Sequence, residues 1–170
     1  FSPDKMFRLD SVKYDLIAHE TAHQWFGDAV TEREWSHVWL SEGFATYFAA
    51  LYTQHSRGDS AFRVSMEKIR ETVLTAEEVT RRPVIDTIET KLTSLLHANS
   101  YDQGGFVLHM FREDLGDSAV SRGFRRSVRK HRQGPALYAD LQRDQDLDSV
   151  RTFSPYCRPW WPRPGHPEHA

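Results

Sequence analysis

Hydrophobic side chains recur every three or four residues along most of this chain, the spacing that places them on one face of an α-helix. The clearest case follows Asp59-Ser60, where one apolar stripe is made of Phe62, Met66, Ile69 and Val73. The pattern predicts helices at residues 15–26, 41–56, from 59 to the region before Pro83, 101–115, 117–133 and 138–146, with a helical turn at 92–97. We therefore expect a mainly α fold, with residues 28–40 as a partly extended connector.

Glycine, proline and capping residues mark the ends of these predicted helices. Gly27-Asp28 is expected to end the first helix, Ser41 to cap the second, and Gly116 to end the helix that begins at 101. The last stretch differs, because its prolines between residues 155 and 167 exclude a helix or a central strand. We expect a helical domain over residues 1–150 and an irregular tail, rich in proline and tryptophan, over 151–170.

The first predicted helix carries the sequence His19-Glu20-Thr21-Ala22-His23. A helix turns once per 3.6 residues, so the two histidines lie one above the other, where two imidazoles can bind one metal ion. Glu20 lies beside the first histidine and can reach a metal-bound water, while Glu42 on the next helix can supply a third ligand. Three protein ligands and one open position are what a catalytic zinc site requires. The motif is short, and two ordinary helix histidines are the competing interpretation.

The second predicted helix has two distinct faces. One is a bulky apolar stripe made of Phe44, Tyr47, Phe48 and Leu51. The other consists mostly of small residues and is made of Glu42, Ala45, Thr46 and Ala49. Small side chains let two helices approach closely, which would bring the Glu42 carboxylate against the histidine face. Glu42 also suits the first turn of a helix, where negative charge is favoured, and the two roles are compatible.

Longer motifs surround these residues. The stretch HETAHQWFGDAVTEREWSHVWLSEGFATYF resembles the zinc-binding segment of the gluzincin aminopeptidases, the family of membrane alanyl aminopeptidase, endoplasmic-reticulum aminopeptidases and leukotriene hydrolase. Members show HExxHQWFG and then W-x-x-x-W-L-N-E-G-F-A, and here Ser41 replaces the usual Asn. A further segment, Tyr101-Asp102-Gln103-Gly104, is similar to the family's Y-x-K-G, with Gln103 in place of Lys.

The resemblance covers about residues 15–148 and implies the helical portion of a thermolysin-like zinc metallopeptidase catalytic domain. It implies that one Zn²⁺ is held by His19, His23 and Glu42. It also implies that Glu20 is the general base and that the Tyr101 hydroxyl steadies the oxyanion. The implied activity is that of an aminopeptidase, which removes amino-terminal residues from peptide substrates.

One segment of the family pattern is missing from this chain. Members carry G-x-M-E-N a little over twenty residues before the first metal histidine, and its glutamate grips the substrate's free amino terminus; only eighteen residues precede His19 in this sequence. The family's β-rich amino-terminal domain and helical carboxy-terminal domain are missing too, so we expect other domains of a longer parent protein as partners. Two alternatives stay open: a truncated zinc-binding fragment with little or no activity, and a thermolysin-type endopeptidase.

Composition argues against several other functions. No run approaches the roughly 18 apolar residues of a membrane span, and a net charge of −2 gives no attraction to nucleic acid or anionic lipid. The basic residues between 122 and 132 are interpreted as a solvated helix face, with Phe124 and Val128 turned inward, rather than as a nucleic-acid patch. The single cysteine, Cys157, excludes an intramolecular disulfide and is interpreted as an incidental thiol.

Residues next to the histidine motif are given structural roles. Leu16 and Ile17 indicate that the first helix is mostly buried. Four aromatic residues are expected to pack under the site: Trp25, Phe26, Trp35 and Trp39. Asp28 is either a hydrogen-bond partner of a ligand histidine or a plain helix-end carboxylate.

Overall fold

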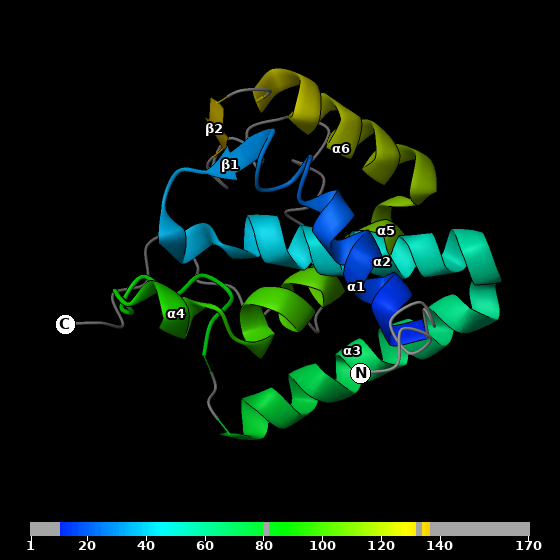
Figure 1. Cartoon of the computed structure of the whole chain (residues 1–170), viewed down its shortest axis with the longest axis horizontal. Helices are drawn as coiled ribbons and strands as arrows, with labels where there is room; N and C mark the ends of the chain where they lie inside the picture. Colours follow the sequence, from blue (N-terminus) through cyan, green and yellow to red (C-terminus); the bar gives the residue numbers. More distant parts are fainter. Residues whose placement is uncertain (1–10, 80–81, 132–133, 137–170) are drawn as a thin grey trace, which may run out of the picture.

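Helices dominate the computed structural model, which describes residues 11–79, 82–131 and 134–136 (Figure 1). In chain order the elements are α1 (Ser11–Ala22), β1 (Val30–Glu32), the 3₁₀ turn η2 (Trp35–His37), α2 (Trp39–Arg57), α3 (Asp59–Val79), α4 (Leu92–Leu95), the π-helical turn η3 (Asn99–Gln103), α5 (Gly104–Leu115), α6 (Asp117–His131) and β2 (Gly134–Ala136). The mainly α fold class expected from the apolar spacing is confirmed.

The central element is α2, which runs through the middle of the molecule with α6 on one side and α3 on the other (Figure 1). It contacts α1, α3, α5 and η3. Its bulky stripe is buried as predicted, since Phe44 and Tyr47 are only 4% and 0% exposed. Phe48 and Leu51 pack against the same cluster. A helix covered on several sides needs apolar or small residues on most of its circumference, which the two stripes of α2 provide.

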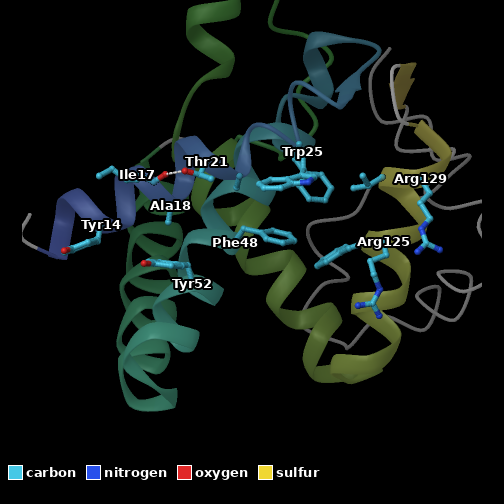
Figure 2. Close-up of a pocket in the computed structure, with 13 residues that line it drawn as sticks. Tyr14, Ile17, Ala18, Thr21, Trp25, Phe48, Tyr52, Arg125 and Arg129 are labelled. Atoms are coloured by element: carbon cyan, nitrogen blue, oxygen red, sulfur yellow. Dashed lines mark hydrogen bonds between the residues drawn. The ribbon is translucent and has the colours of Figure 1, made fainter.

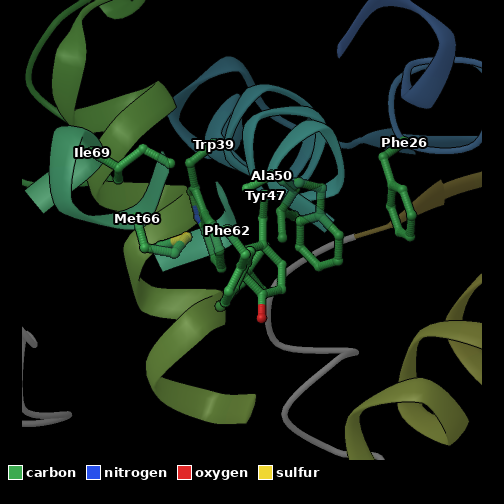
Figure 3. Packing of buried hydrophobic residues seen from close by; sticks show 10 residues of the cluster. Phe26, Trp39, Tyr47, Ala50, Phe62, Met66 and Ile69 are labelled. Carbon is green, nitrogen blue, oxygen red and sulfur yellow. The ribbon is translucent and has the colours of Figure 1, made fainter. Parts of the chain in front are cut away.

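The main apolar core lies where α3 and α5 pack against α2 (Figure 3). The stripe predicted for α3 is confirmed, because all four of its side chains are buried. The rings of Tyr47 and Phe62 meet edge to face, with their centroids 6.5 Å apart. Burial of each large apolar side chain contributes about 1.5–3 kcal/mol relative to its exposure. Four such residues on one face therefore fix which side of α3 turns toward α2.

Two glycines let α2 come into backbone contact with the start of α5. A Cβ added at Gly43 would lie 2.8 Å from the Cα and the carbonyl carbon of Gly104. A Cβ added at Gly104 would lie 3.0 Å from the Gly43 Cα. Because each obstacle is backbone, no change of side-chain rotamer relieves it. Gly43 directly follows Glu42, and Gly104 directly follows η3, so this contact sets the separation of those two parts of the chain.

Replacing Gly43 with alanine is expected to destabilise the protein, although alanine favours helices. The gain in propensity is about 1 kcal/mol, whereas overpacking against fixed neighbours costs about 1–3 kcal/mol or more. We expect a net loss of about 1 kcal/mol in the free energy of unfolding, measured by urea denaturation. The control is Ser121→Ala on the exposed side of α6. A Gly43→Ala protein more stable than its parent would contradict the close contact.

A two-stranded parallel pairing joins distant parts of the chain. β1 pairs with β2 in the register Val30 with Gly134, Thr31 with Pro135 and Glu32 with Ala136. Gly134-Pro135 indeed follows the end of α6, but the apolar pattern did not predict that these residues form a strand. Segments of three residues are too short to display the alternation that identifies a strand.

The first helix differs from its prediction in two ways. It ends at Ala22 rather than at residue 26, and the chain continues through a turn that leads to Gly27. The amide of Trp25 bonds to the Ala22 carbonyl, an i→i+3 contact that tightens this end. The expectation that this helix is mostly buried is wrong, because Leu16 and Ile17 are 57% and 50% exposed. Only one face of α1 packs on α2.

Some predictions lie outside the described residues, namely the helix at 138–146, the tail at 151–170 and the environment of Cys157. The short helical turn predicted at 92–97 is confirmed as α4. Within the described ranges, no helix combines the length and the apolar character needed to cross a membrane.

Candidate metal centre

Two helices bring the three predicted ligands together. His19 lies in the last turn of α1, His23 directly follows that helix, and Glu42 lies in the first turn of α2. The Nε2 atoms of His19 and His23 are 3.1 Å apart, and Glu42 Oε2 is 3.3 Å from each. The His23 amide still bonds to the His19 carbonyl at 3.3 Å, which keeps both imidazoles on one face although α1 has ended.

These separations fit the ligand shell of a single tetrahedral ion. Zinc bonds of about 2.0–2.2 Å to nitrogen and oxygen place neighbouring ligand atoms about 3.3–3.6 Å apart. The three donor atoms in this chain are 3.1–3.3 Å apart. Two imidazoles and one carboxylate are also a ligand set of catalytic zinc sites. The side chains are 15–21% exposed, so the centre is shielded but reachable. His19, His23 and Glu42 could therefore hold a zinc ion.

The ring of His23 is oriented by two partners at its other nitrogen. Nδ1 lies 3.0 Å from the Phe26 carbonyl oxygen and 3.2 Å from Ser41 Oγ, and that hydroxyl donates to the same carbonyl at 3.2 Å. A carbonyl can only accept, so Nδ1 carries the hydrogen and Nε2 keeps a lone pair for a metal. Gly27 makes room: its φ is +127°, and a Cβ there would lie 2.7 Å from Ser41 Oγ.

The role expected for Ser41 is wrong. Val38 occupies the N-cap of α2, and Ser41 lies inside the first turn of the helix, 8% exposed. Its hydroxyl faces His23 and the Phe26 carbonyl instead of the free amides of its own helix. Capping preference identifies a residue that can bond to backbone, but it does not say which backbone the fold presents.

Replacing Ser41 with alanine is expected to weaken zinc binding by about tenfold, the lower end of the effect of losing an outer partner of a ligand histidine. The reason is that the His23 ring loses one of its two orienting contacts while the Phe26 carbonyl remains. Competition against a chromogenic chelator measures the affinity. Ser56→Ala is the matched control, since the Ser56 hydroxyl bonds to the Tyr52 carbonyl on the exposed end of α2. Equal zinc affinity of the Ser41→Ala protein and its parent would rule out this orienting role.

Opposing effects act on the pKa of Glu42. Burial, the largest single effect, raises the pKa of Glu42. The hydrogen bond to His19, the charges of the two histidines and the nearby Tyr101 hydroxyl lower this pKa, and together they outweigh burial. The net shift is therefore downward. Glu42 is therefore ionised at neutral pH, as a metal ligand must be. Nearby, burial raises the pKa of Glu32 on β1, with the charge of Glu42 adding to the effect. Nothing in the sequence pattern singled out Glu32.

Tyr101 stands beside the three ligands. Its ring stacks on that of His19, with centroids 5.9 Å apart and planes 15° apart. Burial and the negative charges of Glu42 and Glu20 raise the pKa of Tyr101 to about 12. Glu20 directly follows His19 in α1 and is exposed. The structure thus brings together four of the residues singled out by the sequence: His19, His23, Glu42 and Tyr101.

The aromatic residues near the motif divide into two groups. Phe26 and Trp39 are buried, as expected of residues that pack under the site. For Trp25 and Trp35 the expectation is wrong, because they are 51% and 58% exposed. Asp28 is exposed, and its backbone amide bonds to the His23 carbonyl at 3.0 Å. The partners of His23 Nδ1 are Phe26 and Ser41. Because α1 ends at Ala22, Asp28 lies in the turn beyond the helix and not at its end.

A groove of about 700 Å³ lies between α1 and α6 (Figure 2). α1, α2 and α6 form its walls, with Ile17 and Trp25 from α1 and the turn after it, Phe48 from α2 and Arg129 from α6. The candidate metal ligands are not among the residues described around it. The groove is therefore separate from the site where the predicted chemistry would occur.

Comparison with known proteins agrees with the fold and with the family resemblance. The peptidase family M1 domain matches residues 7–151. Human glutamyl aminopeptidase is 32% identical over 132 residues, which are 74% of this chain and 14% of that protein. Human endoplasmic reticulum aminopeptidase 2 is 31% identical over 131 residues, 74% of this chain and 13% of that protein.

Solved structures of related enzymes match the fold of this chain. The M1 zinc metallopeptidase from Deinococcus radiodurans matches with a TM-score of 0.66 and 28% identity, over 79% of this chain and 29% of that one. Yeast LTA4 hydrolase shares the fold with a TM-score of 0.76 at 19% identity, over 92% of this chain and 27% of that one.

The fold therefore places the molecule in the class of helical metallopeptidases, and two histidines and a glutamate form its candidate metal centre. The chain belongs to peptidase family M1. This confirms the family resemblance inferred from the motifs. The chain spans about one seventh of the length of the curated relatives that it matches, 14% in the case of human glutamyl aminopeptidase.

Proposed function

We propose that this chain is the catalytic segment of a zinc aminopeptidase that removes amino-terminal residues from peptides through a metal-activated water. The observation that carries the proposal is the convergence of two imidazole nitrogens and one carboxylate oxygen at 3.1–3.3 Å. Membership of family M1 supports the peptidase class. The relatives' names support the aminopeptidase type, and one solved relative was studied with the peptide substrate Tyr-Ser-Ala.

In this proposal one Zn²⁺ is held by His19, His23 and Glu42, and it supplies Lewis-acid chemistry to water and to the scissile carbonyl. Glu20 accepts a proton from the attacking water and later delivers it to the leaving amine. The Tyr101 hydroxyl donates a hydrogen bond to the oxyanion that develops at the scissile carbonyl. With a pKa raised to about 12, the Tyr101 phenol keeps its proton at neutral pH and remains a donor.

The alternative is a zinc-binding fragment that is inactive or poorly active alone. The chain spans 14% of the length of human glutamyl aminopeptidase, so the activity of the isolated chain has to be measured directly. A thermolysin-type endopeptidase is a further alternative, with the same ligand set but no need for a free amino terminus.

Turnover and zinc content together separate these possibilities. The zinc-loaded chain is assayed with leucyl, alanyl and glutamyl p-nitroanilides and with an amino-blocked peptide. We expect release from the anilides in proportion to bound zinc, and none from the blocked peptide. Cleavage of the blocked peptide would favour the endopeptidase. Stoichiometric zinc without turnover would reject catalysis by this chain alone and support the fragment.

Replacing Tyr101 with phenylalanine is expected to lower kcat by about 10²–10³-fold, the usual effect of losing one oxyanion donor. KM should change little, because the hydroxyl acts on charge that develops only in the transition state. Steady-state kinetics on leucyl anilide measure both constants. Tyr52→Phe, on the exposed side of α2, is the control. A Tyr101→Phe protein with unchanged kcat and a raised KM would show that Tyr101 binds substrate rather than stabilising the oxyanion.

A further inference from the structure

The segment between α3 and η3 is held by one arginine. Arg82 donates to Asp86 Oδ2 through Nε at 3.1 Å and through Nη2 at 2.9 Å, and to the Ser94 carbonyl through Nη1 at 2.7 Å. Nη2 also lies 3.3 Å from Glu89 Oε2. One guanidinium therefore ties together three points of an otherwise irregular stretch, using the several donors that only arginine offers in one plane.

Asp86 is the buried half of this contact. It is 7% exposed, and its Oδ1 accepts the backbone amides of Ile88 at 3.1 Å and Glu89 at 3.0 Å. Burial raises the pKa of Asp86, but the bonds from Glu89, Arg82 and Ile88 together outweigh burial and lower it. Both oxygens of a charged carboxylate are thus used, one for the arginine and one for the turn at 88–89. We name the pair Arg82 and Asp86 the loop clamp.

A hydrogen bond connects the loop clamp to the turn that carries Tyr101. The side-chain amide of Asn99 donates to the backbone carbonyl of Arg82. Asn99 is 1% exposed, and its own backbone amide donates to His97 Nδ1 at 3.2 Å. Ser100, also 1% exposed, donates from its hydroxyl to the Leu95 carbonyl at 2.5 Å. The two residues before Tyr101 are therefore anchored to the loop by their side chains.

The local backbone explains why such anchoring is needed. In η3 the amide of Gly104 bonds to the carbonyl of Asn99, five residues back, so the turn is wider than that of an α-helix. Single π-helical turns are rare and occur frequently at functional sites. On the other side, the Gly43–Gly104 contact holds the end of η3 against α2. Tyr101 lies between these two anchors, with its ring stacked on that of His19.

We propose that Arg82 is a positioning residue: its guanidinium fixes Asp86 and the Ser94 carbonyl, and so holds in place the backbone carbonyl to which Asn99 bonds, which sets Tyr101 against His19. The catalytic consequence rests on the proposed function, since it is the oxyanion bond of Tyr101 that would be lost. Among the described residues, the contacts of Arg82 include neither the ligands nor Tyr101. Its effect on the chemistry therefore passes entirely through the placement of η3.

A double-mutant cycle separates positioning from general support of the fold. Arg82→Ala is expected to lower kcat on leucyl anilide by about 10–100-fold with KM within about twofold, a loss of an interaction made only in the transition state. In a Tyr101→Phe background the same substitution should change kcat by less than about twofold, because the group it positions is gone. Equal losses in both backgrounds would overturn the proposal and show that Arg82 is merely structural.

The control and a milder variant guard against misfolding. Arg70 makes a similar two-point contact with Glu67 on the exposed side of α3, at 3.0 Å and 2.5 Å, so Arg70→Ala removes a comparable ion pair far from η3. Its kcat should equal that of the parent. If Arg82→Ala does not fold, Asp86→Asn takes its place in the cycle. The asparagine oxygen still accepts the two backbone amides, while its NH2 group cannot accept a bond from Arg82.

A readout without turnover keeps this proposal distinct from the proposed function. In the zinc-free and zinc-loaded chain, NMR on labelled protein detects the nuclear Overhauser effect between the Tyr101 and His19 rings. It should be present in the parent and in Arg70→Ala, and weakened or lost in Arg82→Ala. Its full retention in Arg82→Ala would overturn the positioning role even if the chain is inactive. An inactive chain that loses the effect would reject catalysis and retain the positioning.

Discussion

Replacing Glu20 with glutamine is expected to lower kcat by about 10²–10⁴-fold, the range that a positioned general base contributes. Glutamine keeps the shape of the side chain but cannot accept a proton at neutral pH. Zinc content should stay the same, because Glu20 is not one of the three converging ligands. Steady-state hydrolysis of leucyl anilide and metal analysis of the same sample measure the two quantities.

The matched control for this prediction is Glu71→Gln, an exposed glutamate on α3. It should retain both turnover and zinc. A Glu20→Gln protein that hydrolyses the anilide as fast as its parent would remove Glu20 from the mechanism. A variant that loses its zinc would instead show that Glu20 supports the metal centre itself.

The second large effect concerns the metal. Replacing His23 with alanine is expected to abolish stoichiometric zinc binding, because only two of the three converging donors remain. In the parent, zinc at 100 times its Kd adds about 2.7 kcal/mol to the free energy of unfolding. That increment should be missing from the His23→Ala protein. Thermal unfolding with and without added zinc measures it, together with metal analysis after dialysis.

His55→Ala serves as the control for the zinc measurement, since His55 lies exposed near the end of α2. It should keep both the zinc and the zinc-dependent rise in Tm. If the His23→Ala protein were stabilised by zinc as strongly as the parent, the ion would be bound elsewhere, and the assignment of His23 would be wrong.

The proximity of the two histidines could be predicted because the information is local. His19 and His23 are four residues apart on a helix, and that spacing alone puts their rings on one face. The partnership with Glu42 needed the longer motif, since a separation of 23 residues says nothing by itself about proximity. The buried stripe of α3 was equally accessible, because four apolar residues in helical register leave few other arrangements.

The surroundings of the ligands could not be predicted in the same way. Whether Ser41 caps its helix or bonds to His23 depends on where the turn after α1 brings the Phe26 carbonyl, and that depends on Gly27 at a φ of +127°. In η3 the Asn99 side chain likewise bonds to the Arg82 carbonyl, 17 residues away, and helix propensity does not reveal such a contact. Side-chain hydrogen bonds between distant segments leave no periodic trace in a sequence.

The exposure of α1 shows a different limit. Leu16 and Ile17 are apolar and helical in spacing, so burial was the natural expectation, yet both border open space or the groove beside α6. Periodicity predicts which residues share a face of a helix. It does not reveal whether a second element within this chain covers that face.

X-ray absorption spectroscopy at the zinc edge tests most directly whether His19, His23 and Glu42 hold the metal. We predict one zinc ion per chain, bound by two imidazole nitrogens and by oxygen ligands at about 2.0–2.2 Å. A sulfur ligand at about 2.3 Å, a shell without imidazole, or a dialysed chain that retains no zinc would contradict this centre.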